Sequence, residues 1–333
     1  MPWYDLPLEQ LRDYRTATRE PAGLDGWWAA RVADARDRAK PVTLTRHEPG
    51  LYGAVEVYDA EFSGAGGDRI RAWYIKPPES TPGGGEARTV TVTFIGYGGG
   101  RGAPAEHILL PAIGYPVFVM DTRGQGGRWT FGATGDAGSG GPENSQVMTR
   151  GVTSPETYYY TRLITDAALA VDAAAELAGP DAKISVRGHS QGGGLALAAA
   201  ALHGDRIAAC QADVPFLCDI QRAITLAPNG PYIEIPQFLA HNVDLADRVL
   251  DTLRYVDCAL LARRVTAPTL MSASLMDPIC PPSTVFAAYN EITAEKEIVV
   301  NPYTTHEVAH GHSERLIRHL REHLLRARCA RPA

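Results

Sequence analysis

The sequence contains little lysine and no long apolar segment. Lysine occurs only at positions 40, 76, 183 and 296, which we interpret as a coding bias rather than a functional signal. No block of Lys and Arg accompanies the net charge of −6, so nothing indicates a nucleic-acid partner. The longest apolar run, LALAAAAL at 195–202, is far too short to span a membrane. We therefore expect neither a nucleic-acid nor a membrane partner.

The cysteines show no paired pattern, and the first residues show no pattern typical of a secretory leader. The five cysteines are irregularly spaced and form no CxxC pair; they are Cys210, Cys218, Cys258, Cys280 and Cys329. Buried free thiols are the expected state for most of them. The first residues, MPWYDLPLEQLRDYR, have no basic region followed by an apolar one, as a signal peptide would. These features predict a soluble cytoplasmic protein.

The pattern of apolar residues predicts an α/β fold. Residues 1–50 have helical patterns and form an expected N-terminal extension, whereas alternation at 54–62 and 69–77 predicts two antiparallel strands joined by the turn GAGGD. A surface loop is expected at 80–87. Six further strands are expected, with helices between several of them and a C-terminal amphipathic helix; these strands are 90–96, 115–122, 183–190, 207–216, 269–277 and 297–303.

Strands that alternate with helices predict a mostly parallel central sheet covered by helices on both faces. The mostly helical segment 217–265 interrupts this alternation, and we interpret it as an insertion or cap over the site. The length of 333 residues also allows two domains, but a single domain over 1–333 that carries a cap is the preferred interpretation.

The strongest local motif is Gly188-His189-Ser190-Gln191-Gly192, which fits G-x-S-x-G. It follows the strand pattern ISVR and precedes an Ala/Leu-rich helix. A nucleophilic serine needs this strand–turn–helix context, because the sharp turn lifts Oγ above the sheet. The alternative is a glycine-rich turn whose serine only caps the helix.

A serine nucleophile requires a histidine base and an orienting acid, in the order Ser, Asp or Glu, His. Asp277 follows the apolar strand TLMSASLM, and His306 follows EIVVNPY through Thr304-Thr305. Both therefore lie where a strand delivers a side chain to one edge of the sheet. The alternatives are a turn acid before Pro278 and an exposed loop histidine.

Two main-chain N–H groups are expected to form an oxyanion hole. One belongs to Gln191, which follows the nucleophile, and the other to Tyr97 in the glycine-rich loop GYGGGRG at 96–102. Phosphate binding by this loop is the weaker alternative, because its spacing matches neither the P-loop nor G-x-G-x-x-G.

His306-Glu307-Val308-Ala309-His310 also fits the zinc motif H-E-x-x-H. A zinc site needs both histidines on one helix and a third ligand downstream, for which His312 is the available residue. Gly311 follows the motif at once and the segment starts in a loop, so we expect no metal.

Several blocks over residues 1–328 resemble carbohydrate esterase family 7, which contains acetyl xylan esterases and cephalosporin C deacetylases. The RGQ, GxSQG and HE elements of that family occur here in order. The matching blocks are Gly96-Tyr97 with GGGRG, Arg123-Gly124-Gln125, MTRGVTSPETYYYTRLITDA, GHSQGGG, DVPFLCDIQRAI, LMDPICPPSTVFAAYN and His306-Glu307.

The resemblance implies an α/β-hydrolase fold and a serine esterase that removes acetyl groups from small substrates without a cofactor. It assigns Ser190 as nucleophile, Asp277 as acid and His306 as base, with Tyr97 and Gln191 at the oxyanion hole. Tyr97 would also touch the substrate, and the helical insertion of the family corresponds to 217–265.

The resemblance further implies supporting residues, a small acyl pocket and a ring-like homohexamer. Arg123 and Gln125 would hold the loops beside the site, and Glu307 the loop of His306. The pocket would be lined by Phe216, Pro231 and Ile279.

The sequence departs from the family at Ile95, where a histidine is usual, and at His189, where a small residue is usual. His189 could narrow the mouth of the site, polarise it or only pack. Glycines that usually follow His306-Glu307 are replaced, and the stretch 126–145 is rich in Gly and Trp/Phe. Alternatives to the esterase are a peptidase or lactone hydrolase on the same fold, a zinc hydrolase, and a binding module without activity.

Overall fold

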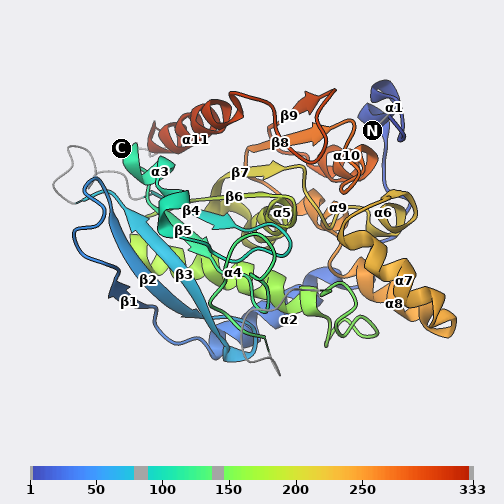
Figure 1. Ribbon diagram of the computed structural model, residues 1–333, viewed down its shortest axis with the longest axis horizontal. Coiled ribbons are helices and arrows are strands. Elements are labelled where there is room, and N and C mark those ends of the chain that lie inside the picture. Colours follow the sequence, from blue (N-terminus) through green and yellow to red (C-terminus); the bar gives the residue numbers. More distant parts are fainter. Residues whose placement is uncertain (1–2, 79–88, 137–145, 330–333) are drawn as a thin grey trace.

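The computed structural model describes residues 3–78, 89–136 and 146–329 (Figure 1). Within these residues the strands form one sheet, in the order β1-β2-β3-β5-β4-β6-β7-β8-β9. The strands are β1 (Thr43–Arg46), β2 (Glu56–Ser63), β3 (Arg69–Lys76), β4 (Thr89–Phe94), β5 (Val117–Met120), β6 (Lys183–His189), β7 (Ile207–Asp213), β8 (Thr269–Ser274) and β9 (Lys296–Asn301).

Strands β5, β4, β6, β7, β8 and β9 are parallel, whereas β1, β2 and β3 form an antiparallel extension that joins β5. The helices are α1 (Leu8–Asp13), α2 (Leu24–Asp37), α3 (Leu109–Ala112), α4 (Tyr159–Ala178), α5 (Gln191–His203), α6 (Ile220–Leu226), α7 (Glu234–Ala240), α8 (Ala246–Arg254), α9 (Cys258–Leu261), α10 (Pro282–Glu291) and α11 (His312–Cys329). This architecture confirms the predicted mostly parallel sheet.

Apolar side chains from both faces of the sheet form two core clusters. The larger cluster lies under α4 and α5, where Val92 and Val186 meet Ile164 and Leu197. The smaller cluster lies on the opposite face, where Val119 and Ile95 pack against Leu320 and Leu324 of α11 and Leu110 of α3. Helices therefore cover both faces, as the β–α alternation predicts (Figure 1).

The N-terminal fifty residues differ from the prediction in two ways. Strand β1, whose four residues are all exposed, forms an edge where only helix was expected. Helix α1 ends at Asp13, and the residues that follow it up to Gly23 are not helical. Beyond it, the hydroxyl groups of Tyr14 and Thr16 donate to the carboxylate of Asp219, each at 2.7 Å. These long-range bonds, together with the low helix propensity of threonine, override the local helical pattern.

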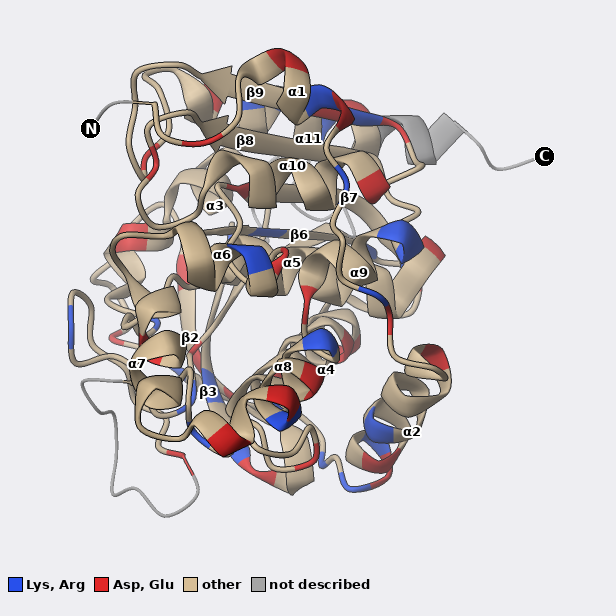
Figure 2. Ribbon diagram, turned by 90° about the vertical axis from the view of Figure 1, so that its right-hand side faces the viewer, with Lys and Arg blue, Asp and Glu red and all other residues tan. Residues whose placement is uncertain are grey.

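The segment 217–265 is mostly helical, as predicted, and contains α6, α7, α8 and α9. Figure 2 shows basic and acidic residues interspersed on α2 and α8 rather than gathered by sign. No helix in the described part of the chain has the length and apolar character of a membrane span.

Four cysteines are buried free thiols, as expected: Cys210, Cys218, Cys258 and Cys280. The side chain of Cys329 and the predicted loop at 80–87 lie outside the described part of the structure.

Candidate active site

Ser190 occupies the tight turn between β6 and α5. Its backbone has φ 58° and ψ −120°, which is rare for a residue with a side chain. The turn is held by main-chain bonds: the Ser190 N–H donates to the carbonyl of Asp213 at 2.8 Å, and the Ser190 carbonyl accepts from Phe216 N–H at 2.9 Å. These bonds compensate for the strained conformation, so the strand–turn–helix geometry expected for G-x-S-x-G is present.

The two glycines of the motif are required by close packing. A Cβ on Gly188 would lie 2.2 Å from the main chain of Gly192, and a Cβ on Gly192 would lie 2.2 Å from the carbonyl oxygen of Phe94. Both contacts involve backbone atoms that cannot move aside. The small residues therefore allow α5 to start directly against β4 and β6.

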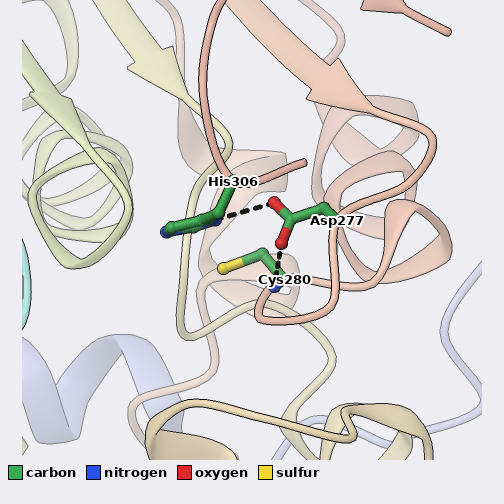
Figure 3. Close-up of side chains that lie close together, drawn as sticks. All are labelled: Asp277, Cys280 and His306. Carbon is green, nitrogen blue, oxygen red and sulfur yellow. Dashed lines mark hydrogen bonds and ion pairs between the residues drawn. The ribbon is translucent and has the colours of Figure 1, made fainter. Parts of the chain in front are cut away.

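His306 links Ser190 to Asp277 by two hydrogen bonds. Its Nε2 lies 2.8 Å from Ser190 Oγ. Its Nδ1 lies 2.7 Å from Asp277 Oδ2, a hydrogen bond that Figure 3 shows as a dashed line. An ionised carboxylate only accepts hydrogen bonds, so Nδ1 carries the proton and Nε2 is left to accept from the serine hydroxyl. This is the tautomer in which histidine can act as a base toward serine.

Asp277 is fully buried, and both oxygens of its carboxylate accept hydrogen bonds. Its Oδ1 accepts from the N–H groups of Ile279 at 2.8 Å and Cys280 at 2.9 Å, while Oδ2 faces His306. The main-chain donors follow Pro278 in a tight turn after β8. Because both oxygens are engaged, the carboxylate has one orientation, and this orientation fixes the imidazole.

The loop that carries His306 is fastened to the end of β8. Ser274 Oγ donates to the main-chain carbonyl of Glu307 at 2.7 Å and lies 2.8 Å from Thr304 Oγ1, which donates to it. The side chain of Glu307 is exposed. The family resemblance implied that Glu307 supports the loop of His306. In the structure, Glu307 fastens this loop through its main-chain carbonyl.

Residues near the N-terminus of the chain also bind both loops. The hydroxyl of Tyr4 donates to the main-chain carbonyl of Asp277, and the indole N–H of Trp3 donates to the carbonyl of Pro302 at 2.9 Å. Asp5 accepts from the N–H of Ser283 at 2.7 Å. The sequence contained no signal for these contacts, because their partners are nearly three hundred residues away.

Cys280 is the third side chain in Figure 3, and with Asp277 and His306 it forms the one group of potential metal ligands among the described residues. Burial, followed by the charge of Asp277, raises the pKa of its thiol well above the ordinary value, so it stays protonated. Metal ions require the thiolate. The carboxylate and imidazole already satisfy each other, so these donors fit a hydrogen-bonded site better than a metal site.

The H-E-x-x-H segment does not have the geometry of a zinc motif. His306 to His310 lie in a loop rather than in a helix, so the two histidines are not one helical turn apart. His310 is exposed. His312 is buried, and its Nε2 lies 2.6 Å from Asp213 Oδ1. The apparent zinc motif therefore combines His306, which belongs to the site, with His310, which is exposed, and His312, which is paired with Asp213.

The buried pair of His312 and Asp213 was not predicted as part of the site. Asp213 ends β7, and its carbonyl holds Ser190 N–H, while its carboxylate also accepts from Ser272 Oγ at 2.9 Å. His312 begins α11 and closes the loop that carries His306. The pair therefore ties the histidine loop to the turn of the nucleophile, across 99 residues of sequence.

Tyr97 lies in the loop after β4 and is held on both sides of its peptide unit. Its carbonyl accepts from the indole N–H of Trp129 at 2.8 Å, and the next N–H, of Gly98, donates to Gln125 Oε1 at 2.6 Å. Its phenol donates to Glu234 Oε1 at 2.6 Å. Gln191 opens α5, and the first N–H groups of a helix have no carbonyl partner within it. Their use as oxyanion donors remains a prediction.

Gln125 connects the loop of Tyr97 to the start of α5. Its Nε2 donates to Gln191 Oε1 at 3.0 Å and to Tyr159 Oη at 2.8 Å. Gln191 Oε1 also accepts from Tyr160 Oη at 3.0 Å, and Gln191 Nε2 donates to the carbonyl of Ile95 at 3.2 Å. The network joins the segments that carry both expected oxyanion donors. Ile95, one of the two departures from the family, takes part through its main chain.

Arg123 is fully buried and lies behind this network. Its guanidinium forms two hydrogen bonds with Asp166, at 2.5 and 2.7 Å, and one with Asp68 at 2.9 Å. Its carbonyl accepts from Tyr159 Oη at 2.6 Å. These contacts, which do not reach Ser190, are those of a residue that holds the loop after β5.

A cavity of about 380 Å³ opens beside Ser190. It is lined by Gly96, Tyr97, Arg128, Trp129, His189, Ser190, Gly230, Pro231, Ile279 and His306. Pro231 and Ile279 were expected here. Phe216 was also expected, but it is fully buried one layer behind, against Tyr97 and Tyr232. Arg128 and Trp129 were missed, although they lie in the Gly- and aromatic-rich stretch that the sequence marks as unusual.

His189, the second departure from the family, lines the cavity and contacts the base. Its ring lies 5.1 Å from that of His306, at an interplanar angle of 67°. Burial, reinforced by His306, lowers the pKa of His189 to about 4, although Asp213 and Asp277 oppose the shift. The imidazole is therefore neutral at pH 7 and adds no charge to the cavity.

We expect His189 to make the protein less stable as the pH falls from about 6.5 to about 4. In the unfolded chain it binds a proton near pH 6.5, whereas the folded protein resists protonation down to about pH 4. The unfolded state thus binds more protons in this window, so the free energy of unfolding decreases as the pH is lowered. The free energy of unfolding of the His189→Asn variant, measured with urea between pH 4 and 7, should depend less steeply on pH than that of the wild type.

The matched control is His241→Asn, because His241 is exposed. It should leave the slope of the wild type unchanged. A residual slope is expected in His189→Asn, since burial also lowers the pKa of His319 to about 4. Equal slopes for His189→Asn and the wild type would contradict the prediction.

Comparison with known proteins agrees with the motifs of the sequence. A model of the family "Acetyl xylan esterase (AXE1)" matches residues 1–323. The curated acetyl esterase Axe7A from Xylanibacter ruminicola is 25% identical over 302 residues, which are 90% of this chain. The chain spans 65% of the length of that protein.

Solved structures are similar over almost the whole chain. An acetyl xylan esterase from Paenibacillus sp. R4 is 33% identical with a TM-score of 0.84, covering 96% of this chain and 100% of that one. Acetyl xylan esterase 1 from Thermoanaerobacterium sp. JW/SL YS485 is 32% identical with a TM-score of 0.83, covering 96% and 99%. These matches confirm the predicted α/β-hydrolase fold and the resemblance seen in the motifs. The chain belongs to the acetyl xylan esterase family.

Proposed function

We propose that this protein is a serine esterase that hydrolyses acetyl esters of sugars or related small molecules. The observation that carries the proposal is the continuous line of hydrogen bonds from Asp277 through His306 to Ser190, beside a cavity of about 380 Å³. Membership of the acetyl xylan esterase family supports the same reaction. The names of the relatives place xylan acetates among the candidate substrates.

In the first step of the proposed mechanism, Ser190 Oγ attacks the carbonyl carbon of the ester while His306 Nε2 takes its proton. The carbonyl π electrons move to oxygen. The N–H groups of Tyr97 and Gln191 bind this oxyanion, and losing one such donor typically costs about 3–4 kcal/mol of transition-state stabilisation. The intermediate then collapses, and the C–O bond to the alcohol breaks as His306 returns the proton to the alcohol oxygen.

In the second step, water replaces the alcohol. His306 Nε2 takes a proton from the water as its oxygen attacks the acetyl carbon, and the second intermediate expels Ser190 Oγ, which recovers the proton. The products are acetate and free enzyme, and the chain needs no cofactor for either step. Asp277 stays ionised and stabilises the imidazolium of His306 throughout.

The contacts of Arg123 and Gln125 support a role for them in holding the oxyanion segments rather than in chemistry. Pro231 and Ile279 are proposed to limit the acyl group to a small size. Two further parts of the proposal, a ring-like homohexamer and a cytoplasmic location, rest on the family resemblance and the sequence alone. We also propose that residues 1–333 form one domain in which 217–265 is a cap, because Gly230 and Pro231 of this segment line the cavity.

The purified protein is expected to hydrolyse 4-nitrophenyl acetate faster than the butyrate, and to hydrolyse the octanoate at least about tenfold more slowly. The reason is that Pro231 and Ile279, which line the cavity, are proposed to restrict the length of the acyl chain. EDTA should leave the rates unchanged. Equal rates for octanoate and acetate would contradict the small pocket, and loss of activity with EDTA would contradict the serine mechanism.

A further inference from the structure

The cavity beside Ser190 has a closed wall and an open wall. On the closed side, Pro231 is buried and Gly230 is in direct contact with Ile279, to which a Cβ on Gly230 would approach within 2.8 Å. On the open side, Trp129 is 59% exposed and Arg128 is exposed as well. An acetyl group is small enough for the closed side, so the alcohol half of the ester must extend along Trp129 and Arg128.

The open wall is held in place by the loop of Tyr97. The indole N–H of Trp129 is bonded to the carbonyl of Tyr97, and the N–H of Arg128 donates to the carbonyl of Gly98 at 3.2 Å. The aliphatic part of Arg128 lies across Gly98, where a Cβ would come within 2.9 Å of its Cδ. The stem of the arginine is thus packed, and Arg128 lines the cavity from a segment that is fixed by these hydrogen bonds.

Arg128 supplies the permanent charge among the described residues that line this cavity. His189 is neutral at pH 7, and the remaining lining is largely apolar. No ion pair joins Arg128 to a carboxylate of the described residues. Among the described residues, the charge of Arg128 lowers the pKa of Glu234 against the effect of burial, but the oxygens of Glu234 accept from Tyr97 Oη and from the N–H of Met148. The guanidinium is therefore available to a ligand.

We infer that Arg128 selects acetyl esters whose alcohol half carries a carboxylate. The substrate's acetyl group meets Ser190 against the closed wall, its alcohol packs along Trp129, and its carboxylate binds the guanidinium of Arg128. Arginine suits this task because its planar fork can donate two parallel hydrogen bonds to a carboxylate. The inference rests on the proposed esterase function and adds the chemical class of the leaving alcohol.

Three aryl acetates that share one skeleton and carry different charges test this inference. They are 4-acetoxyphenylacetate, its neutral amide, and the analogue with a trimethylammonium group in place of the carboxylate. A methylene group separates the charge from the ring, and each rate is divided by that for hydroxide-catalysed hydrolysis. In the wild type, kcat/KM should favour the carboxylate over the amide by about tenfold, equivalent to about 1.4 kcal/mol, mainly through KM. The cationic ester should be the poorest substrate.

In Arg128→Gln the ratio of carboxylate to amide should fall to about one, and Arg128→Lys should keep part of it, because lysine retains the charge but not the fork. Added salt should reduce the preference of the wild type. Arg321→Gln is the matched control: Arg321 is exposed on α11 and outside the cavity lining, so this variant should keep the tenfold ratio.

The inference would be overturned if the wild type showed no preference for the carboxylate, or if Arg128→Gln retained that preference. In either case, hydrolysis of the acetyl ester of the neutral compound would still support the esterase. If the wild type hydrolysed none of the three acetates and did not hydrolyse 4-nitrophenyl acetate either, the proposed function itself would be contradicted.

Discussion

Replacement of Ser190 by alanine is expected to lower kcat for acetyl ester hydrolysis by about a million-fold, the loss seen when a serine triad loses its nucleophile. Without Oγ no acyl-enzyme forms, and His306 has no proton to take. The backbone should not change, because alanine keeps the Cβ of serine in the same turn, which is held by main-chain bonds to Asp213 and Phe216. The measurement is steady-state hydrolysis of 4-nitrophenyl acetate by both proteins.

A chemical probe makes the test independent of the assay. A fluorophosphonate should add one phosphonyl group to the peptide that contains Ser190 in the wild type and none in the Ser190→Ala variant, as seen by mass spectrometry. Ser313→Ala is a suitable control, because Ser313 is exposed at the start of α11. It should keep full activity. Activity of Ser190→Ala within tenfold of the wild type would remove this residue from the mechanism.

Replacement of Asp277 by asparagine is expected to lower kcat by about ten-thousand-fold, for a reason visible in the hydrogen bonds. The N–H groups of Ile279 and Cys280 both point at one oxygen of Asp277. Asparagine must turn its carbonyl oxygen toward these donors, so its NH₂ group faces His306 Nδ1. That nitrogen then has to accept a hydrogen bond, the proton moves to Nε2, and the base can no longer take the proton of Ser190.

The result should appear in kcat rather than in KM, because Asp277 is fully buried and does not line the cavity. Thermal unfolding of the variant should show that it folds. The matched control, Asp205→Asn, changes an exposed carboxylate and should have no effect. If Asp277→Asn lost tenfold or less, the orienting acid would have to be sought elsewhere, and the buried Asp213 would be examined next.

The turn around Ser190 could be predicted because its requirements are local. The strand, the two glycines, the serine and the helix lie within a short stretch, and each has its own pattern in the sequence. The places of Asp277 and His306 could be predicted because each follows an apolar strand, and parallel strands bring their carboxyl ends to one edge. Their roles in catalysis remain proposals.

The walls of the cavity could not be predicted in the same way. Trp129 reaches the site because its indole bonds to Tyr97, 32 residues earlier in the chain, and no periodic pattern encodes such a contact. Phe216 lies behind the cavity because Tyr97 and Tyr232 pack on it. Strand β1 was missed because its residues are all exposed, so it has no apolar alternation to identify it.

The bonds of Trp3 and Tyr4 have a consequence for how the enzyme is made. They join Trp3 and Tyr4 to partners that lie 299 and 273 positions later in the chain. During translation these hydrogen bonds cannot form until most of the chain has emerged, whereas the β2–β3 hairpin can form earlier. Ordering the loops of Asp277 and His306 becomes a late event in folding, because contacts of such long range carry a large cost of loop closure. A nascent chain would thus remain inactive until both parts have met.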